Sequence, residues 1–71
     1  MPFVKYISEG KKAPDVKITA SVNKGATWKT TMLKCGQSYP IAGNATNLLI
    51  DNVPYDPKKN YIIRNGNVAQ S

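Results

Sequence analysis

Residues 47–64 of the chain are NLLIDNVPYDPKKNYIIR, in which two short apolar runs flank a polar segment that contains two prolines. The runs at 48–50 and 61–63 are too short for helices. Asn, Asp or Pro, which favour turns, stand at their ends. We therefore interpret the two runs as a central pair of β-strands joined by a loop.

Residues 16–23 alternate between apolar and polar side chains. The apolar set is Val16, Ile18, Ala20 and Val22, and the polar set is Lys17, Thr19, Ser21 and Asn23. A period of two is typical of a strand that buries one face. Gly25 follows within a run of turn-forming residues and tolerates a positive φ, so we expect a hairpin into the next strand.

Residues 27–35 fit two periods. As a strand, the segment has favourable threonines, and Trp28, Thr30 and Met32 share a face. As a helix, Trp28, Met32 and Cys35 lie along one stripe. We favour the strand because of the β-branched content. The sequence leaves open whether Trp28 is in the core or on the surface.

Residues 33–39 are LKCGQSY, with a leucine, a glycine and a tyrosine at characteristic spacing. The stretch resembles the tyrosine corner of Greek-key sandwiches. That resemblance implies that the Tyr39 hydroxyl bonds to the backbone a few residues upstream and pins the chain between two sheets. We take from it a β-rich corner at Tyr39 and no membership of the fibronectin or immunoglobulin families.

Asn65 and Gly66 form the preferred pair for a two-residue type I′ hairpin turn. In that register Ile63 opposes Val68, and the last strand is short and polar, which suits a sheet edge. The sequence therefore predicts one all-β domain over residues 1–71, a small β-sandwich or barrel of about five to seven short antiparallel strands.

The N-terminal residues 1–14 are expected to form a strand or an arm, followed by a loop. A short run of strand formers, apolar on both sides, is followed by glycine, proline and charged residues. A strand that is apolar on both faces needs cover on both, and a small domain finds the second cover in a neighbouring copy or a larger protein. The residues expected to make this contact are Phe3, Val4, Tyr6 and Ile7.

Ten basic residues, nine of them lysine, stand against four acidic ones and give a net charge of +6. The charge favours acidic partners. Specific recognition of bases or phosphates usually depends on the planar fork of arginine, so a lysine-rich surface indicates diffuse attraction.

The residue inventory argues against an enzyme. The chain has no histidine and one cysteine, which excludes Ser-His and Cys-His activation, an internal disulfide and a Cys/His zinc site. Asp51 and Asp56 are interpreted as turn formers and Cys35 as a small buried side chain. We expect no cofactor and no small-molecule substrate.

The chain shows no signal peptide and no run long enough to span a bilayer, so we expect synthesis in a cytoplasm. A chain of this length buries only roughly 60% of its unfolded surface. The core is therefore thin, and neither an internal disulfide nor zinc stabilises it. This absence favours a homo-oligomer or docking onto a larger assembly.

The expected function is that of a non-enzymatic structural module, such as a small virion decoration, head-fibre-base or cement protein. The alternative is a small basic barrel that binds single-stranded nucleic acid by base stacking and phosphate contact. The residues for this alternative are Trp28, Lys29, Lys58, Lys59 and Arg64. A carbohydrate-binding sandwich is a third hypothesis, based on the corner resemblance and a surface Trp28.

Overall fold

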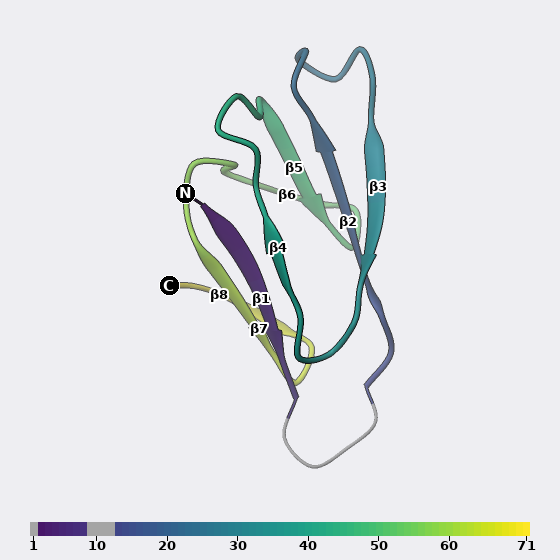
Figure 1. The fold of residues 1–71 in the computed structure, drawn as a ribbon, viewed down its shortest axis with the longest axis vertical. Helices are drawn as coiled ribbons and strands as arrows, with labels where there is room; N and C mark the ends of the chain where they lie inside the picture. Colours follow the sequence, from purple (N-terminus) through teal and green to yellow (C-terminus); the bar gives the residue numbers. More distant parts are fainter. Residues whose placement is uncertain (1, 9–12) are drawn as a thin grey trace.

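The computed structural model describes residues 2–8 and 13–71, and in these residues it contains eight strands and no helix. The strands are β1 (Phe3–Ile7), β2 (Val16–Ser21), β3 (Lys29–Leu33), β4 (Ser38–Pro40), β5 (Asn47–Ile50), β6 (Val53–Tyr55), β7 (Tyr61–Arg64) and β8 (Asn67–Gln70). They form two four-stranded sheets, β4-β1-β7-β8 and β3-β2-β5-β6 (Figure 1). The all-β prediction is confirmed, although the strand number exceeds the expectation and β1 pairs with β7 in parallel.

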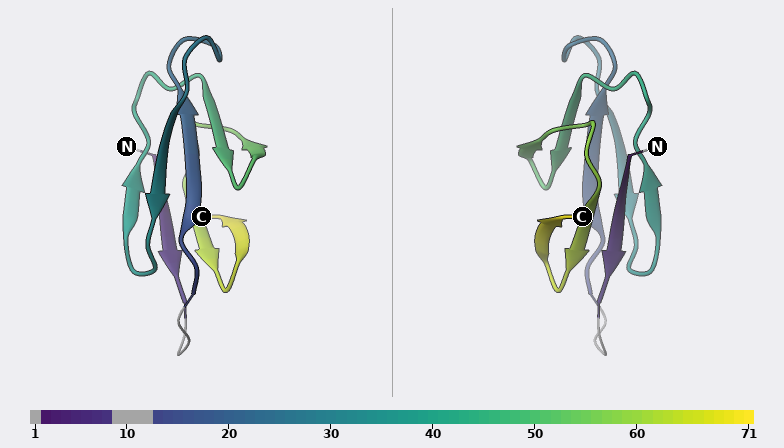
Figure 2. Two further views of the ribbon diagram at one scale, coloured as in Figure 1. Left: turned by 90° about the vertical axis from the view of Figure 1, so that its right-hand side faces the viewer. Right: turned by 90° about the vertical axis from the view of Figure 1, so that its left-hand side faces the viewer.

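The two sheets enclose one apolar core. In the side views of Figure 2 the strands of one sheet lie in front of those of the other. The first sheet contributes Val4, Tyr6, Tyr61 and Ile63, the second contributes Val16, Ile18, Leu33, Leu48 and Ile50, and the β4–β5 connection adds Ile41 and Ala45. Side chains on one strand alternate between its faces, so the inward positions of β1, β2, β5 and β7 supply most of this core.

β1 is an interior strand and not an arm. It lies antiparallel to β4 on one side and parallel to β7 on the other. Val4 and Tyr6 are buried in the chain's own core, while Phe3 and Ile7 are half-buried on the opposite face. The two-sided apolar pattern of this segment is therefore that of a strand inside a sheet, and its inner face is covered within the chain.

The two apolar runs of residues 47–64 lie in different sheets. β5 pairs with β2 and β6, whereas β7 pairs with β1 and β8, so the expected pairing of the two runs is wrong. The segment expected to be a loop contains β6, which forms a hairpin with β5. Asp51 and Asn52 have φ of 50° and 66° and make the two-residue turn of that hairpin.

The predictions for β2, β3 and the last hairpin are confirmed. Residues 16–21 form a strand, and residues 29–33 form a strand and not a helix. Ile63 is the register partner of Val68, as expected. Asn65 and Gly66 both have positive φ, 50° and 83°, which is the conformation that a type I′ turn requires.

Candidate functional site

β3 and β4 are edge strands of different sheets, and residues 34–37 join them at one end. Backbone bonds close this end: the Gly36 N–H donates to the Tyr6 carbonyl at 2.9 Å, and the Tyr6 N–H donates to the Gln37 carbonyl at 3.0 Å. From the turn the two strands separate (Figure 1). The boundary between the sheets is thus closed at the turn and open at the other end.

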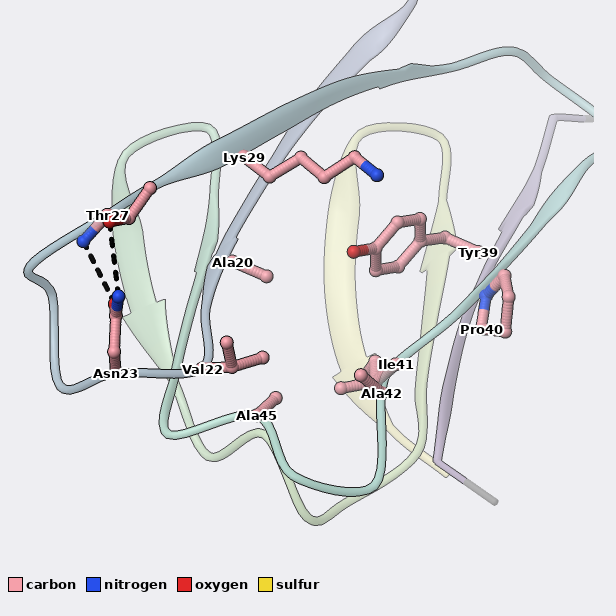
Figure 3. Close-up of a pocket in the computed structure, with 10 residues that line it drawn as sticks. All are labelled: Ala20, Val22, Asn23, Thr27, Lys29, Tyr39, Pro40, Ile41, Ala42 and Ala45. Atoms are coloured by element: carbon pink, nitrogen blue, oxygen red, sulfur yellow. Dashed lines mark hydrogen bonds between the residues drawn. The ribbon is translucent and has the colours of Figure 1, made fainter.

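A groove occupies the open end, with a volume of about 620 Å³. Figure 3 shows its lining: Ala20, Val22, Asn23, Thr27, Lys29, Tyr39, Pro40, Ile41, Ala42 and Ala45. Its floor is apolar, and the alanines that lie there leave room that larger side chains would fill. Val22 is 51% exposed although it continues the inward face of β2. The core is therefore incompletely covered along this boundary.

Two polar groups lie at the mouth of the groove. The Lys29 ammonium and the Tyr39 hydroxyl both point into the opening (Figure 3). Lys29 is exposed on β3 and Tyr39 is half-buried on β4. The mouth therefore offers a cation and a hydroxyl above an apolar floor.

Tyr39 does not make the expected tyrosine corner. In the part of the chain that the structure describes, its hydroxyl has no backbone partner. The corresponding bond is made by Tyr61, whose hydroxyl donates to the Asp56 carbonyl, five residues upstream, at 2.8 Å. Burial raises the pKa of Tyr61 above its ordinary value.

Side-chain bonds organise the loop that borders the groove between β2 and β3. The Asn23 Oδ1 accepts the Thr27 N–H at 2.9 Å, and the Asn23 amide donates to the Thr27 hydroxyl at 3.1 Å. The Ser21 hydroxyl accepts the Gly25 N–H at 2.9 Å. These bonds hold the loop in one conformation and so define one wall of the opening.

The outer side of β3 carries backbone groups that no described strand pairs. The Asp51 N–H donates to the Lys17 carbonyl at 2.9 Å, so the backbone of Lys17 faces β5. Backbone groups point to alternate sides along a strand. The next residue of β2 therefore faces β3, and its register partner Thr31 faces back towards it. The N–H and C=O groups of Thr30 and Met32 consequently point away from the sheet.

Two of the other sheet edges carry proline. The Ile41 N–H donates to the Pro2 carbonyl, so the adjacent Pro40 faces outward from β4. Pro54 of β6 also faces outward, because its register partner Leu49 faces β2. Proline has no N–H, and its presence at an edge discourages further strand pairing. β3 and β8 carry no proline, and of these two only β3 borders the groove.

The residues of the nucleic-acid hypothesis do not share one surface. Lys58 and Lys59 lie between β6 and β7, whereas Arg64 ends β7 at its other end. Lys29 lines the groove, whereas Trp28 precedes β3 and lies over Gly25. Lys58 instead lines a second pocket of about 540 Å³ together with Lys24, Asn44, Ala45, Thr46, Asn47, Asp56 and Pro57.

Trp28 is on the surface, with 43% of its area exposed. Part of its ring lies over its own loop, since a Cβ built on Gly25 would come within 3.2 Å of the indole Cζ2. The positive φ of Gly25, 89°, also favours glycine at this position. Trp28 therefore packs on the turn before β3 and does not stand free as a stacking platform.

Three further features of the described residues concern metal binding, the cysteine and membrane spans. They contain no group of three His, Cys, Asp or Glu residues that could hold a metal ion. Cys35 is exposed in the β3–β4 turn, so the expected burial is wrong. Over residues 2–8 and 13–71, the structure has no helix of the length and apolarity that a membrane span requires.

Comparisons with known proteins return no match: no family model, curated protein or solved structure resembles the chain.

The groove was not predicted from the sequence, because its lining comes from β2, β3, β4 and the two adjoining loops. A local signal for it was the presence of Ala42 and Ala45, small residues beside the buried Ile41. Whether these small residues leave a groove depends on which strands surround them in the fold.

Proposed function

We propose that the chain is a non-enzymatic structural module, a two-layer β-sandwich that docks onto a larger protein assembly. The observation that supports this proposal is the apolar groove between β3 and β4, beside an edge strand whose backbone groups are open. Small virion decoration, head-fibre-base and cement proteins are examples of this class of module.

The groove replaces the expected docking arm as the contact surface. Val4 and Tyr6 are 0% and 2% exposed, so they have almost no area left for a partner. Val22 and Tyr39, by contrast, present apolar surface at the opening. Covering such surface is favourable by about 25 cal/mol per Å² of apolar area. A partner seated there would complete a core that is thin in a chain of this size.

The charge distribution fits the same role. The net charge of +6 attracts an acidic surface over distance, and the groove then supplies the specific contact. The nucleic-acid hypothesis has less support, because Arg64 ends β7 at the opposite end from the loop that carries Lys58 and Lys59.

The test is co-sedimentation in extracts of the cells that produce the protein. The wild-type chain should sediment with a particle much larger than itself, at fixed stoichiometry. Val22→Asp places an unpaired charge in the groove and should lower the bound fraction by about tenfold or more. Val53→Asp is the matched control, because Val53 is 50% exposed, like Val22, but does not line the groove. Circular dichroism checks that both variants fold.

Two results would contradict the proposal. One is a wild-type chain that sediments as a free monomer in those extracts. The other is a folded Val22→Asp variant that remains on the particle as fully as Val53→Asp. Sedimentation with single-stranded DNA at physiological salt tests the alternative, which requires binding that the Lys58→Ala, Lys59→Ala double variant weakens.

A further inference from the structure

We infer that the occupant of the groove is an extended segment of an acidic partner protein, which adds to the sheet as a strand beside β3. This inference rests on the proposed function and names the kind of partner. It is carried by three features of one boundary: the open backbone groups of β3, the apolar space beside them, and the charge at the mouth.

The backbone of β3 provides the pairing. Thr30 and Met32 point their N–H and C=O groups away from the sheet, as the register with β2 requires. An extended segment alongside would accept and donate bonds at both residues. β4, on the other side of the groove, has Pro40 at its edge, and proline has no backbone N–H to donate. The added strand accordingly belongs to the β3 sheet.

Alternation determines where the segment's side chains go. Those that face inward would lie beside the inward residues of β3, Lys29 and Thr31, and enter the groove over Ala20 and Val22. An apolar side chain suits the floor. The inward neighbour of Lys29 would be a carboxylate, because opposite charges across paired strands are favourable. Among the residues that line the groove none is acidic, so Lys29 has no carboxylate there from its own chain.

Charge also selects between a foreign segment and a second copy of this chain. Each copy carries a net charge of +6, so two copies of the chain repel each other. An acidic partner is attracted instead.

The probe is a short synthetic peptide that alternates valine and threonine and carries one glutamate among its inward residues. Peptide binding should slow amide hydrogen exchange at Thr30 and Met32 by about tenfold or more at saturation. Val68 and Gln70, the outward residues of the other proline-free edge β8, should be unaffected. N-methylation of the peptide amides that face β3 should abolish binding, while N-methylation of the alternate amides should preserve it.

Charge exchange tests the role of Lys29. A peptide with lysine in place of glutamate should bind about fivefold more weakly, as expected for a cross-strand charge pair. Lys29→Glu should reverse this preference. Lys34→Glu makes the same change in net charge but lies at the closed end, and it should leave the preference intact.

The outcomes separate the inference from the proposed function. Protection confined to Val68 and Gln70, or peptide binding without protection of Thr30 and Met32, overturns strand addition at β3. The same holds if none of the peptides binds at millimolar concentration. In each of these cases the proposed function stands if Val22→Asp still lowers the fraction bound to the particle and Val53→Asp does not. If Val22→Asp remains bound, the proposed function fails as well.

Discussion

The two ends of the β3–β4 boundary differ in how the sheets are joined. At the closed end Tyr6 is buried and uses all its polar groups: its backbone bonds to Gly36 and Gln37, and its hydroxyl donates to the Pro14 carbonyl at 2.7 Å. At the open end Tyr39 is half-buried and its hydroxyl points into the groove. Two tyrosines of one sheet thus distinguish the end of the boundary that the chain fills from the end that it leaves open.

The largest effect should come from proline on the two sides of β3. Thr31→Pro removes an N–H that bonds to β2, and it should destabilise the fold by about 3 kcal/mol or more. Met32→Pro removes an N–H that faces outward, and it should cost less than about 1 kcal/mol while it abolishes peptide binding. Denaturant titration measures both. Equal destabilisation by the two variants would show that the edge is oriented differently.

The sequence predicts the elements whose signals are local. The alternation of β2 and the Asn65–Gly66 turn with its register follow from neighbouring residues, and both are confirmed. The strand β6 was not predicted, because proline is more typical of loops and Pro54 lies at the centre of this strand. At an edge proline is tolerated when its missing N–H faces outward.

The features that depend on distant residues were not predictable in this way. The parallel pairing of β1 with β7 joins segments from opposite ends of the sequence, and no residue of Phe3–Ile7 encodes its neighbour. The same apolar pattern fits an interior strand and a docking arm. The exposure of Trp28 depends on how the loop before β3 folds, and the groove depends on all five segments around it.

The two tyrosines allow a smaller, more direct comparison of the ends. Tyr6→Phe loses the bond to the Pro14 carbonyl, and the melting temperature should fall by about 5 °C. Tyr39→Phe loses no bond within the described chain, so its melting temperature should change by less than about 2 °C. Thermal unfolding followed by circular dichroism decides the matter. A larger loss for Tyr39→Phe would mean that the open end is stabilised from within.

The smallest effect should appear at alkaline pH. Burial raises the pKa of Tyr6, with smaller contributions from nearby Cys35, Asp15 and Asp51, and burial also raises that of Tyr61. The unfolded chain then loses its tyrosine protons first, at its pKa of about 10. The stabilising contribution is complete below that pH and is lost as the pH rises through the folded-state pKa.

Denaturant midpoints measured across this range should therefore decrease, and less steeply in Tyr6→Phe than in wild type. An equal slope for wild type and Tyr6→Phe would contradict a role for the closed end in this dependence.

The parallel pair of β1 and β7 also has a consequence for how the chain reaches its structure. Val4 is the register partner of Tyr61, so the centre of one sheet forms only after the chain has been synthesised as far as Tyr61. The chain loses the conformational entropy of closing this long loop before most of the stabilising contacts form. Proteins dominated by such distant pairings fold in milliseconds to seconds. The hairpin of β2 and β3 pairs residues that are close in the sequence, so the open edge of β3 can form before the sheet that contains β1 and β7 is complete.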